Sequence, residues 1–147
     1  MNCRICNSTK LNLVFDLGLQ PWGNNFLTRE QIGKEKFYPL ELLFCEECNL
    51  SQLSYTVKKE VMFSNHTYLS GMTSSLSKHF KDLSVYINKE FNKDNIKKKI
   101  LDIGSNDGTC LKHFKDLGWE ILGVESSKII SDIANRNNIK TLNKFFN

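Results

Sequence analysis

Residues 102–108 read Asp-Ile-Gly-Ser-Asn-Asp-Gly. A short apolar strand at 99–101 leads into this stretch, and a helix is predicted to follow over 109–117. A strand, a glycine-rich turn and a helix start form the first half of a nucleotide-binding βαβ unit. The dinucleotide fingerprint G-x-G-x-x-G does not fit, because its second and third glycines would fall on Asn106 and Thr109. The missing third glycine argues against a Rossmann dehydrogenase.

The pattern in this turn is D-x-G-x-N-x-G. We expect a positive φ at Asn106, because asparagine is one of the few side chains that tolerate it. The turn resembles the D-x-G-x-G-x-G loop of S-adenosylmethionine (SAM) methyltransferases. That resemblance implies cofactor contacts from Asp102, Gly104, Ser105, Asn106, Asp107 and Gly108.

Glu125 ends the next predicted strand, residues 120–124. It lies about 20 residues beyond the first glycine, where a carboxylate can accept hydrogen bonds from the ribose hydroxyls. We therefore add Glu125 to the expected cofactor-binding residues.

Two Cys-x-x-Cys knuckles lie near the N-terminus, Cys3/Cys6 and Cys45/Cys48. Each knuckle brings two thiolates close enough to share one metal ion, and two knuckles complete a tetrahedral site. The spacing therefore predicts one structural Zn²⁺. Two disulfides or a redox pair are the competing interpretation. The sequence favours zinc because it begins without a secretory signal, and free cysteines are typical of a reducing cytoplasm.

The pattern divides the chain into three parts: a zinc-binding module at 1–60, a substrate loop and linking helix at 61–98, and a partial SAM-binding domain at 99–147. Strands are predicted at 11–17, 38–44 and 50–55, the first ended by Gly18 and Pro21. A helix over 73–92 carries an apolar stripe, which we expect to pack on the SAM-binding domain. The stripe consists of Leu76, Phe80, Leu83, Ile87 and Phe91.

After Glu125 the sequence predicts a helix at 127–135 and a short strand at 139–142. The apolar side of that helix carries Ile129, Ile130, Ile133 and Ala134. The expected fold class is α/β: a small zinc-ribbon-like β module, a linking helix, and the incomplete first half of a Rossmann-like SAM methyltransferase domain. An apolar end just after a third strand is typical of a C-terminally truncated chain, so we expect this piece alone to be inactive.

Charge and hydropathy exclude other classes of protein. The net charge is only +4, and the densest basic run, residues 97–99, precedes a predicted buried strand. We interpret that run as a solvated strand start and do not expect a nucleic-acid surface. Apolar stretches are too short to span a membrane. Free cysteines and metal knuckles agree with a reducing cytoplasm, so a cytoplasmic protein is expected.

Longer motifs resemble one family along almost the whole chain. They are Leu17-Gly18-x-Gln20-Pro21-x-x-Asn24/Asn25-x-Leu27, Tyr38-Pro39-Leu40-x-Leu42-x-x-Cys45-x-x-Cys48-x-Leu50-x-Gln52-Leu53, residues 102–108 and Gly123-Val124-Glu125-Ser126-Ser127. Together with the paired knuckles they resemble SAM-dependent C-methyltransferases with an N-terminal zinc-binding domain, which include C-3 methyltransferases of nucleotide-linked deoxysugars. The resemblance implies a small-molecule partner, a nucleotide-linked sugar.

One segment departs from the family pattern. Where the family reads Tyr-x-Tyr-His/Phe-Ser-Ser, this chain has His66-Thr67-Tyr68-Leu69-Ser70-Gly71. Polar groups of this segment assist at the active site of sugar-methylating members. The departure therefore argues against a sugar substrate more than it argues against methyl transfer. His66 is a candidate for proton handling, since an unperturbed imidazole titrates near neutrality, and Tyr68 for donation to an oxyanion. The alternative, that this segment is only a structural loop over the cofactor, has the same weight as a catalytic role.

Two further functions stay open at this stage. A zinc-containing RNA methyltransferase would need a stronger basic surface with interleaved aromatic residues. A non-catalytic zinc-binding fragment would keep the βα unit only as a scaffold.

Overall fold

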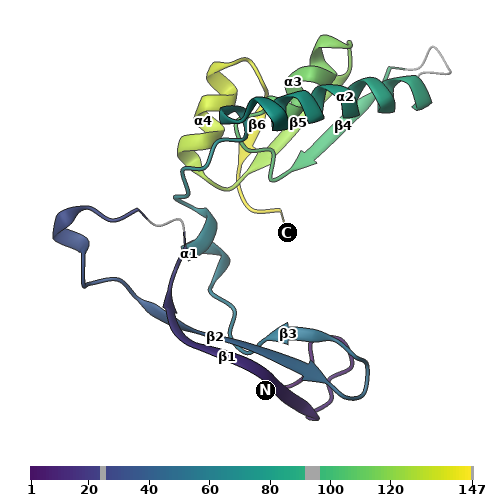
Figure 1. Cartoon of the computed structure of the whole chain (residues 1–147). Coiled ribbons are helices and arrows are strands. Elements are labelled where there is room, and N and C mark those ends of the chain that lie inside the picture. The colour runs from purple at the N-terminus through teal and green to yellow at the C-terminus, as the bar shows by residue number, and fades with distance from the viewer. Residues whose placement is uncertain (24–25, 92–96, 147) are drawn as a thin grey trace. The chain divides into compact units, whose positions relative to one another are not determined.

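The computed structural model describes residues 1–23, 26–91 and 97–146. It divides the chain into two compact units, Met1–Met62 and Phe63–Asn147, and each is described by itself (Figure 1). Three residues of the sequence patterns, Asn24, Asn25 and Asn92, lie outside the described residues.

The N-terminal unit is built on an antiparallel sheet in the order β1-β2-β3. Its strands are β1 (Leu11–Pro21), β2 (Phe37–Cys45) and β3 (Ser51–Leu53), with a 3₁₀ turn η1 (Arg29–Gln31) between the first two. Helix α1 (Lys59–Phe63) runs across the boundary between the units. All three predicted strands are present, and β3 is shorter than its alternating sequence indicated.

The prediction that Gly18 ends the first strand is wrong, because β1 continues to Pro21. The pairing of β1 with β2 shifts register between Leu13 and Phe15 and again between Asp16 and Leu19. Gly18 lies in the second shift with φ of 71°, a conformation that glycine adopts without steric cost. The glycine therefore accommodates a β-bulge, in which extra residues on one strand oppose fewer on its partner.

The C-terminal unit contains a parallel sheet in the order β4-β5-β6. The elements after the linking helix α2 (Ser74–Phe91) are β4 (Lys99–Ile103), α3 (Thr109–Asp116), β5 (Glu120–Glu125), α4 (Lys128–Arg136) and β6 (Thr141–Asn143). This βαβαβ order confirms the predicted first half of a Rossmann-like fold. A short 3₁₀ turn, η2 (Ser70–Met72), precedes α2.

The core of this unit lies between the sheet and the helices α3 and α4. Leu111, Ala134 and Ile139 are buried together, and Ile100 and Ile121 of the sheet pack against them. Ile130 is also fully buried, but Ile129 is 54 % exposed. Ile129 thus lies outside the apolar side that the sequence predicted, because it faces away from the cluster around Leu111.

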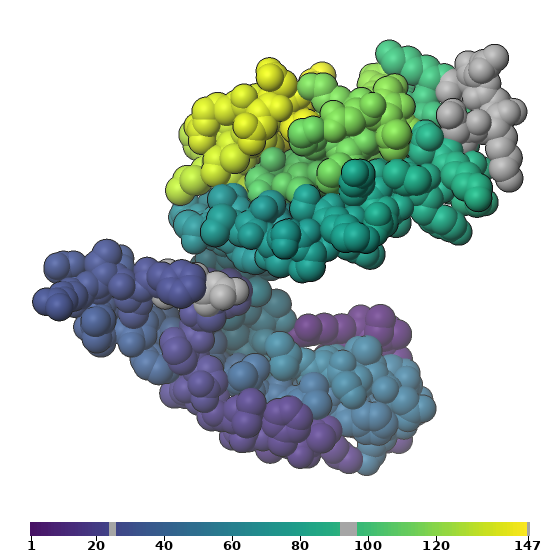
Figure 2. All heavy atoms as spheres, turned by 45° about the horizontal axis from the view of Figure 1, so that its top comes forward, coloured from purple at the N-terminus to yellow at the C-terminus, as the bar shows by residue number. Residues whose placement is uncertain are grey.

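Helix α2 packs against α3, and their side chains lie against each other in the space-filling view (Figure 2). Trp119 joins the two, because its ring lies edge-on to Phe114 of α3 and its Nε1 donates to Asn88 Oδ1 of α2 at 2.9 Å. The linking helix therefore belongs to the C-terminal unit. The last residue of its apolar stripe, Phe91, is 63 % exposed.

Candidate metal centre and cofactor site

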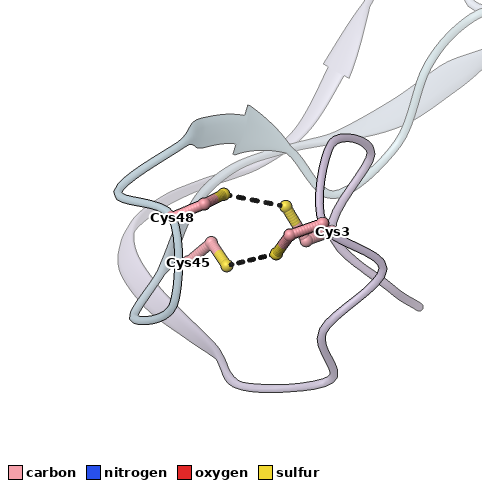
Figure 3. A group of neighbouring side chains, drawn as sticks. Cys3, Cys45 and Cys48 are labelled. Carbon is pink, nitrogen blue, oxygen red and sulfur yellow. Dashed lines mark hydrogen bonds between the residues drawn. The ribbon is translucent and has the colours of Figure 1, made fainter.

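The two knuckles bring four sulfur atoms together at one end of the N-terminal sheet. Cys3 Sγ lies 3.5 Å from Cys48 Sγ, and Cys6 Sγ lies 3.6 Å from Cys45 Sγ (Figure 3). All four sulfurs lie within 4.8 Å of one another. A set of four thiolates at this separation fits one tetrahedral Zn²⁺ ion and leaves no open position for a substrate, as in structural zinc sites.

The same turn builds both knuckles. In the first, the Asn7 amide donates to the Cys3 carbonyl at 3.0 Å, and in the second the Asn49 amide donates to the Cys45 carbonyl at 2.9 Å. Asn7 and Asn49 both have positive φ, 64° and 60°. These two residues were not predicted, although an asparagine directly after each second cysteine is a visible signal.

Among the knuckle cysteines, main-chain hydrogen bonds favour a thiolate at Cys3, whereas burial and the neighbouring thiols raise the pKa of Cys6 to about 12 and also raise that of Cys48. Cys3 and Cys45 are buried, and the five cysteines of the chain are free. Main-chain N–H groups of Cys6 and Ile5 lower the pKa of the Cys3 thiol to about 6. The thiolate is the form that ligates a metal, so this turn prepares Cys3 for a cation.

Cys110 lies in the other unit, on α3. Burial, followed by the charge of Asp102, raises the pKa of its thiol to about 11. It is therefore a protonated, half-buried packing residue.

The glycine-rich turn joins the end of β4 to the start of α3. Three of its residues have positive φ: Gly104 at 77°, Asn106 at 51° and Gly108 at 79°. The value at Asn106 confirms the expected left-handed conformation. No heavy atom lies within 4 Å of the place where a Cβ on Gly104 would stand. Open space above a glycine at this edge of a parallel sheet lets a ligand approach the main chain.

Glu125 lies at the end of β5, beside the glycine-rich turn. Its Oε2 accepts from the Asn106 amide at 3.1 Å, and its Oε1 accepts from the Ser127 amide at 2.7 Å. Ser126 Oγ also donates to Oε1 at 3.4 Å. A carboxylate has about four lone-pair sites, so acceptor capacity remains on Oε2. Its negative charge, after burial, raises the pKa of Asp102 at the end of β4.

His66 covers this carboxylate. Its Nε2 lies 3.5 Å from Glu125 Oε1, and the side chain of Glu125 is only 4 % exposed. The ring of Phe63 lies edge-on to that of His66. Tyr68, in contrast, is 55 % exposed as a residue. The structure thus brings His66 to the predicted cofactor residues and leaves Tyr68 facing solvent nearby.

Residues 63–71, here called the strap, cross the end of this sheet. The Oγ atoms of Ser126 and Ser127 donate to the carbonyls of Phe63 and His66, at 3.2 and 2.9 Å. Asn106 and Asp107 also contact the strap through their side chains. These anchors were not predicted, since each pairs residues at least 36 positions apart and leaves no periodic signal.

A groove of about 440 Å³ opens between the start of α3 and the end of α4. Of the predicted cofactor residues it is lined by Asp107 and Gly108, whereas Gly104 and Glu125 do not line it. We assign it no role in the candidate site.

Comparison with known proteins identifies the N-terminal unit. Residues 3–63 match the family described as "Putative zinc binding domain". The matched residues span nearly all of the N-terminal unit, Met1–Met62. The match includes all four cysteines of the cluster, so the family description and the geometry of the four sulfur atoms both indicate a zinc site.

A curated relative extends the similarity beyond the zinc-binding domain. The chain is 25 % identical over 142 residues to the C-methyltransferase NovU of Streptomyces niveus. This alignment covers 95 % of the chain and 33 % of NovU, so the chain spans about a third of that relative's length. The predicted resemblance to C-methyltransferases with an N-terminal zinc-binding domain is confirmed at this level.

Solved structures of the plantazolicin methyltransferase BpumL match part of the chain. In its complex with S-adenosylhomocysteine (SAH) and a monoazolic desmethylPZN analog, the match has 24 % identity and a TM-score of 0.38, covering 46 % of this chain and 27 % of BpumL. In its complex with SAH alone, it has 28 % identity and a TM-score of 0.34, covering 46 % and 25 %.

Among the described residues, the helices are too short or too polar to cross a membrane.

Proposed function

We propose that this chain supplies the zinc-binding domain and the first half of the cofactor fold of a SAM-dependent C-methyltransferase. The observation that carries the proposal is the position of Glu125. Its carboxylate accepts the main-chain amide of Asn106, so it lies at the same sheet edge as the open main chain of Gly104. A nucleoside needs both, an approachable main chain and a carboxylate for its ribose.

When bound, SAM supplies an electrophilic methyl group on its sulfonium. In the proposed site Gly104 admits the ligand and Glu125 accepts from the ribose hydroxyls. Asp102, Ser105, Asn106, Asp107 and Gly108 complete the proposed cofactor residues. Because Glu125 is covered by His66, the ribose reaches it only after the imidazole has moved aside.

We propose a carbon acid, such as a nucleotide-linked keto-sugar, as the substrate. A base would remove the proton next to the ketone, and the enolate carbon would bond to the methyl group as the bond from that methyl to the sulfonium sulfur breaks and SAH leaves. His66 is the candidate for the proton, and the phenol of Tyr68 is the candidate donor to the developing oxyanion. The enzyme's contribution is then positioning and charge stabilisation.

The basic run supports a small molecule over a nucleic acid as the partner. Lys97 Nζ lies 3.2 Å and Lys99 Nζ 3.6 Å from the carboxylate of Glu120. Partial neutralisation by Glu120 weakens the run as a phosphate-binding patch.

Calorimetric titration of an intact, full-length version of the protein with SAH tests the proposal. Loss of a hydrogen bond to a charged group costs about 1.5–3 kcal/mol, so Glu125→Ala should weaken binding about ten- to hundredfold. Glu120→Ala is the matched control, because Glu120 begins the same strand with an exposed carboxylate. Equal SAH affinity in the wild type and Glu125→Ala contradicts the assignment of Glu125 to the ribose. A wild type that does not bind SAH contradicts the assignment of SAM as the cofactor. Circular dichroism of each variant excludes unfolding as the cause.

A further inference from the structure

Asn106 makes more contacts to the strap than to its own loop. Its Nδ2 donates to the Tyr68 carbonyl at 2.9 Å, and its Oδ1 accepts from the Ser70 amide at 2.9 Å. A side-chain amide that pairs with residues 68 and 70 imitates one residue of a neighbouring parallel strand, which bonds the carbonyl and the amide on either side of the opposing residue. The pairing is therefore directional and holds the main chain on both sides of Leu69.

The Asn106 side chain has little capacity left for another partner. Its Oδ1 also accepts from the Asp107 amide at 2.9 Å, and the residue is only 9 % exposed. An amide oxygen has two lone pairs, so this acceptor is saturated. Its left-handed φ of 51° could be supplied by glycine, as in the family loop, which makes the side chain the distinctive contribution of this residue.

Asp107 fixes the end of the strap beside Asn106. Its Oδ2 accepts from the Gly71 amide at 2.8 Å, and its Oδ1 is held by the amide and the hydroxyl of Thr109. A Cβ on Gly71 would stand 2.7 Å from Thr109 Oγ1 and 2.8 Å from Asp107 Oδ2. Only glycine therefore allows this approach without a shift.

We propose that the side chain of Asn106 is a positioning residue that, with Asp107, holds the strap so that His66 lies over Glu125. The inference rests on the proposed function, because it gives the strap its catalytic side chains. Asn106 then acts through His66 and not as a side-chain ligand of the cofactor.

The test is Asn106→Gly in the full chain, which keeps the left-handed turn and removes both strap bonds. Asn138→Gly is the matched control: Asn138 also has a positive φ, 59°, is exposed, and lies in the same unit. Two signals are measured by NMR, the exchange rate of the Ser70 amide and the ring shifts of the three histidines. In Asn106→Gly the Ser70 amide should exchange about two- to tenfold faster, the equivalent of one net hydrogen bond.

The histidine signals distinguish a local displacement of His66 from a general loosening of the C-terminal unit. In Asn106→Gly the His66 ring shift should move toward that of an exposed histidine, while those of His79 and His113 stay constant. Asn138→Gly should change none of these signals. Unchanged Ser70 exchange and an unchanged His66 shift in a folded Asn106→Gly variant would overturn the proposal.

Gly71→Ala decides the question if Asn106→Gly does not fold, because its Cβ displaces the other half of the proposed anchor, the bond from the Gly71 amide to Asp107. The same loss of Ser70 protection and the same His66 shift are expected, and their absence overturns the proposal. SAH titration of the wild type is read separately. A wild type that binds no SAH refutes the proposed function and leaves the exchange result standing.

Discussion

At the residue scale, asparagine recurs wherever a non-glycine residue is left-handed. Within the described ranges, the non-glycine residues with positive φ are Asn7, Asn49, Asn106 and Asn138. A short polar side chain that bonds locally lowers the cost of this conformation. Two of them close the metal knuckles and one forms the centre of the glycine-rich turn, so both candidate sites depend on the same backbone property.

Gly108 allows a prediction that separates backbone strain from packing. It has φ of 79°, and a Cβ there would stand 2.7 Å from Ile139 Cγ2 in the core. Gly118, with φ of 83°, has open space around the same position. Gly118→Ala should cost about 1–2 kcal/mol of unfolding free energy from conformation alone. Gly108→Ala should cost about 1–3 kcal/mol more, because the core must also shift.

Urea unfolding followed by Trp119 fluorescence measures both values. A Trp22→Phe background makes Trp119 the single tryptophan reporter of the C-terminal unit. Equal losses in the two variants would show that Ile139 yields without cost and would contradict the packing argument.

At the element scale, the sequence predicted the helices, strands and turns that depend on a local pattern. The cysteine spacing predicted the knuckles, and the strand–glycine–helix order predicted β4 and α3. The prediction for Gly18 was wrong because a bulge depends on the register of the partner strand β2, which one strand's sequence does not contain. The burial of Ile129 was overestimated for a similar reason, since helical periodicity does not say how wide the covered side is.

The strap could not be predicted as an anchored element. The polar residues of this segment indicated a functional loop. The serines that hold it, Ser126 and Ser127, lie far away in the sequence, directly after Glu125 at the end of β5. Long-range side-chain to main-chain pairs of this kind carry no periodicity.

The strap also allows a kinetic prediction. In the natural protein, His66→Ala and Tyr68→Phe should each lower methyl transfer from SAM to a keto-sugar nucleotide about 10²–10⁴-fold, as expected when a general acid or base is lost. SAH affinity should not fall in either variant, because Tyr68 serves the substrate and His66→Ala removes the imidazole that covers Glu125. Turnover and calorimetry on the same preparations measure the two effects.

Thr67→Ala is the control for this pair, since Thr67 is exposed and lies between them on the strap. If both His66→Ala and Tyr68→Phe turn over within a few-fold of Thr67→Ala, the strap has a structural role only.

At the scale of the whole molecule, the division into two units predicts a selective response to zinc removal. The zinc-binding domain has a three-stranded sheet with exposed apolar side chains on β1, such as Leu13 and Leu19, and small domains of this kind depend on their metal. Chelation should therefore abolish amide protection in β1–β3 and leave that of β4–β6 in place. Hydrogen exchange with mass spectrometry measures both sheets in one experiment.

Elemental analysis provides the matching control. The reduced protein should contain about one zinc per chain, Cys45→Ser should lower this content and Cys110→Ser should not. Retention of β1–β3 protection after complete zinc removal would contradict a structural metal.

The way the strap is anchored has a consequence for sequence drift. The bonds that hold it end on its own main-chain atoms: the carbonyls of residues 63, 66 and 68 and the amides of residues 70 and 71. Replacing the side chains at 66–69 removes none of these bonds. During evolution or in a mutant library, the side chains at 66–69 can therefore change at this edge of the sheet while the main chain of the strap keeps its position.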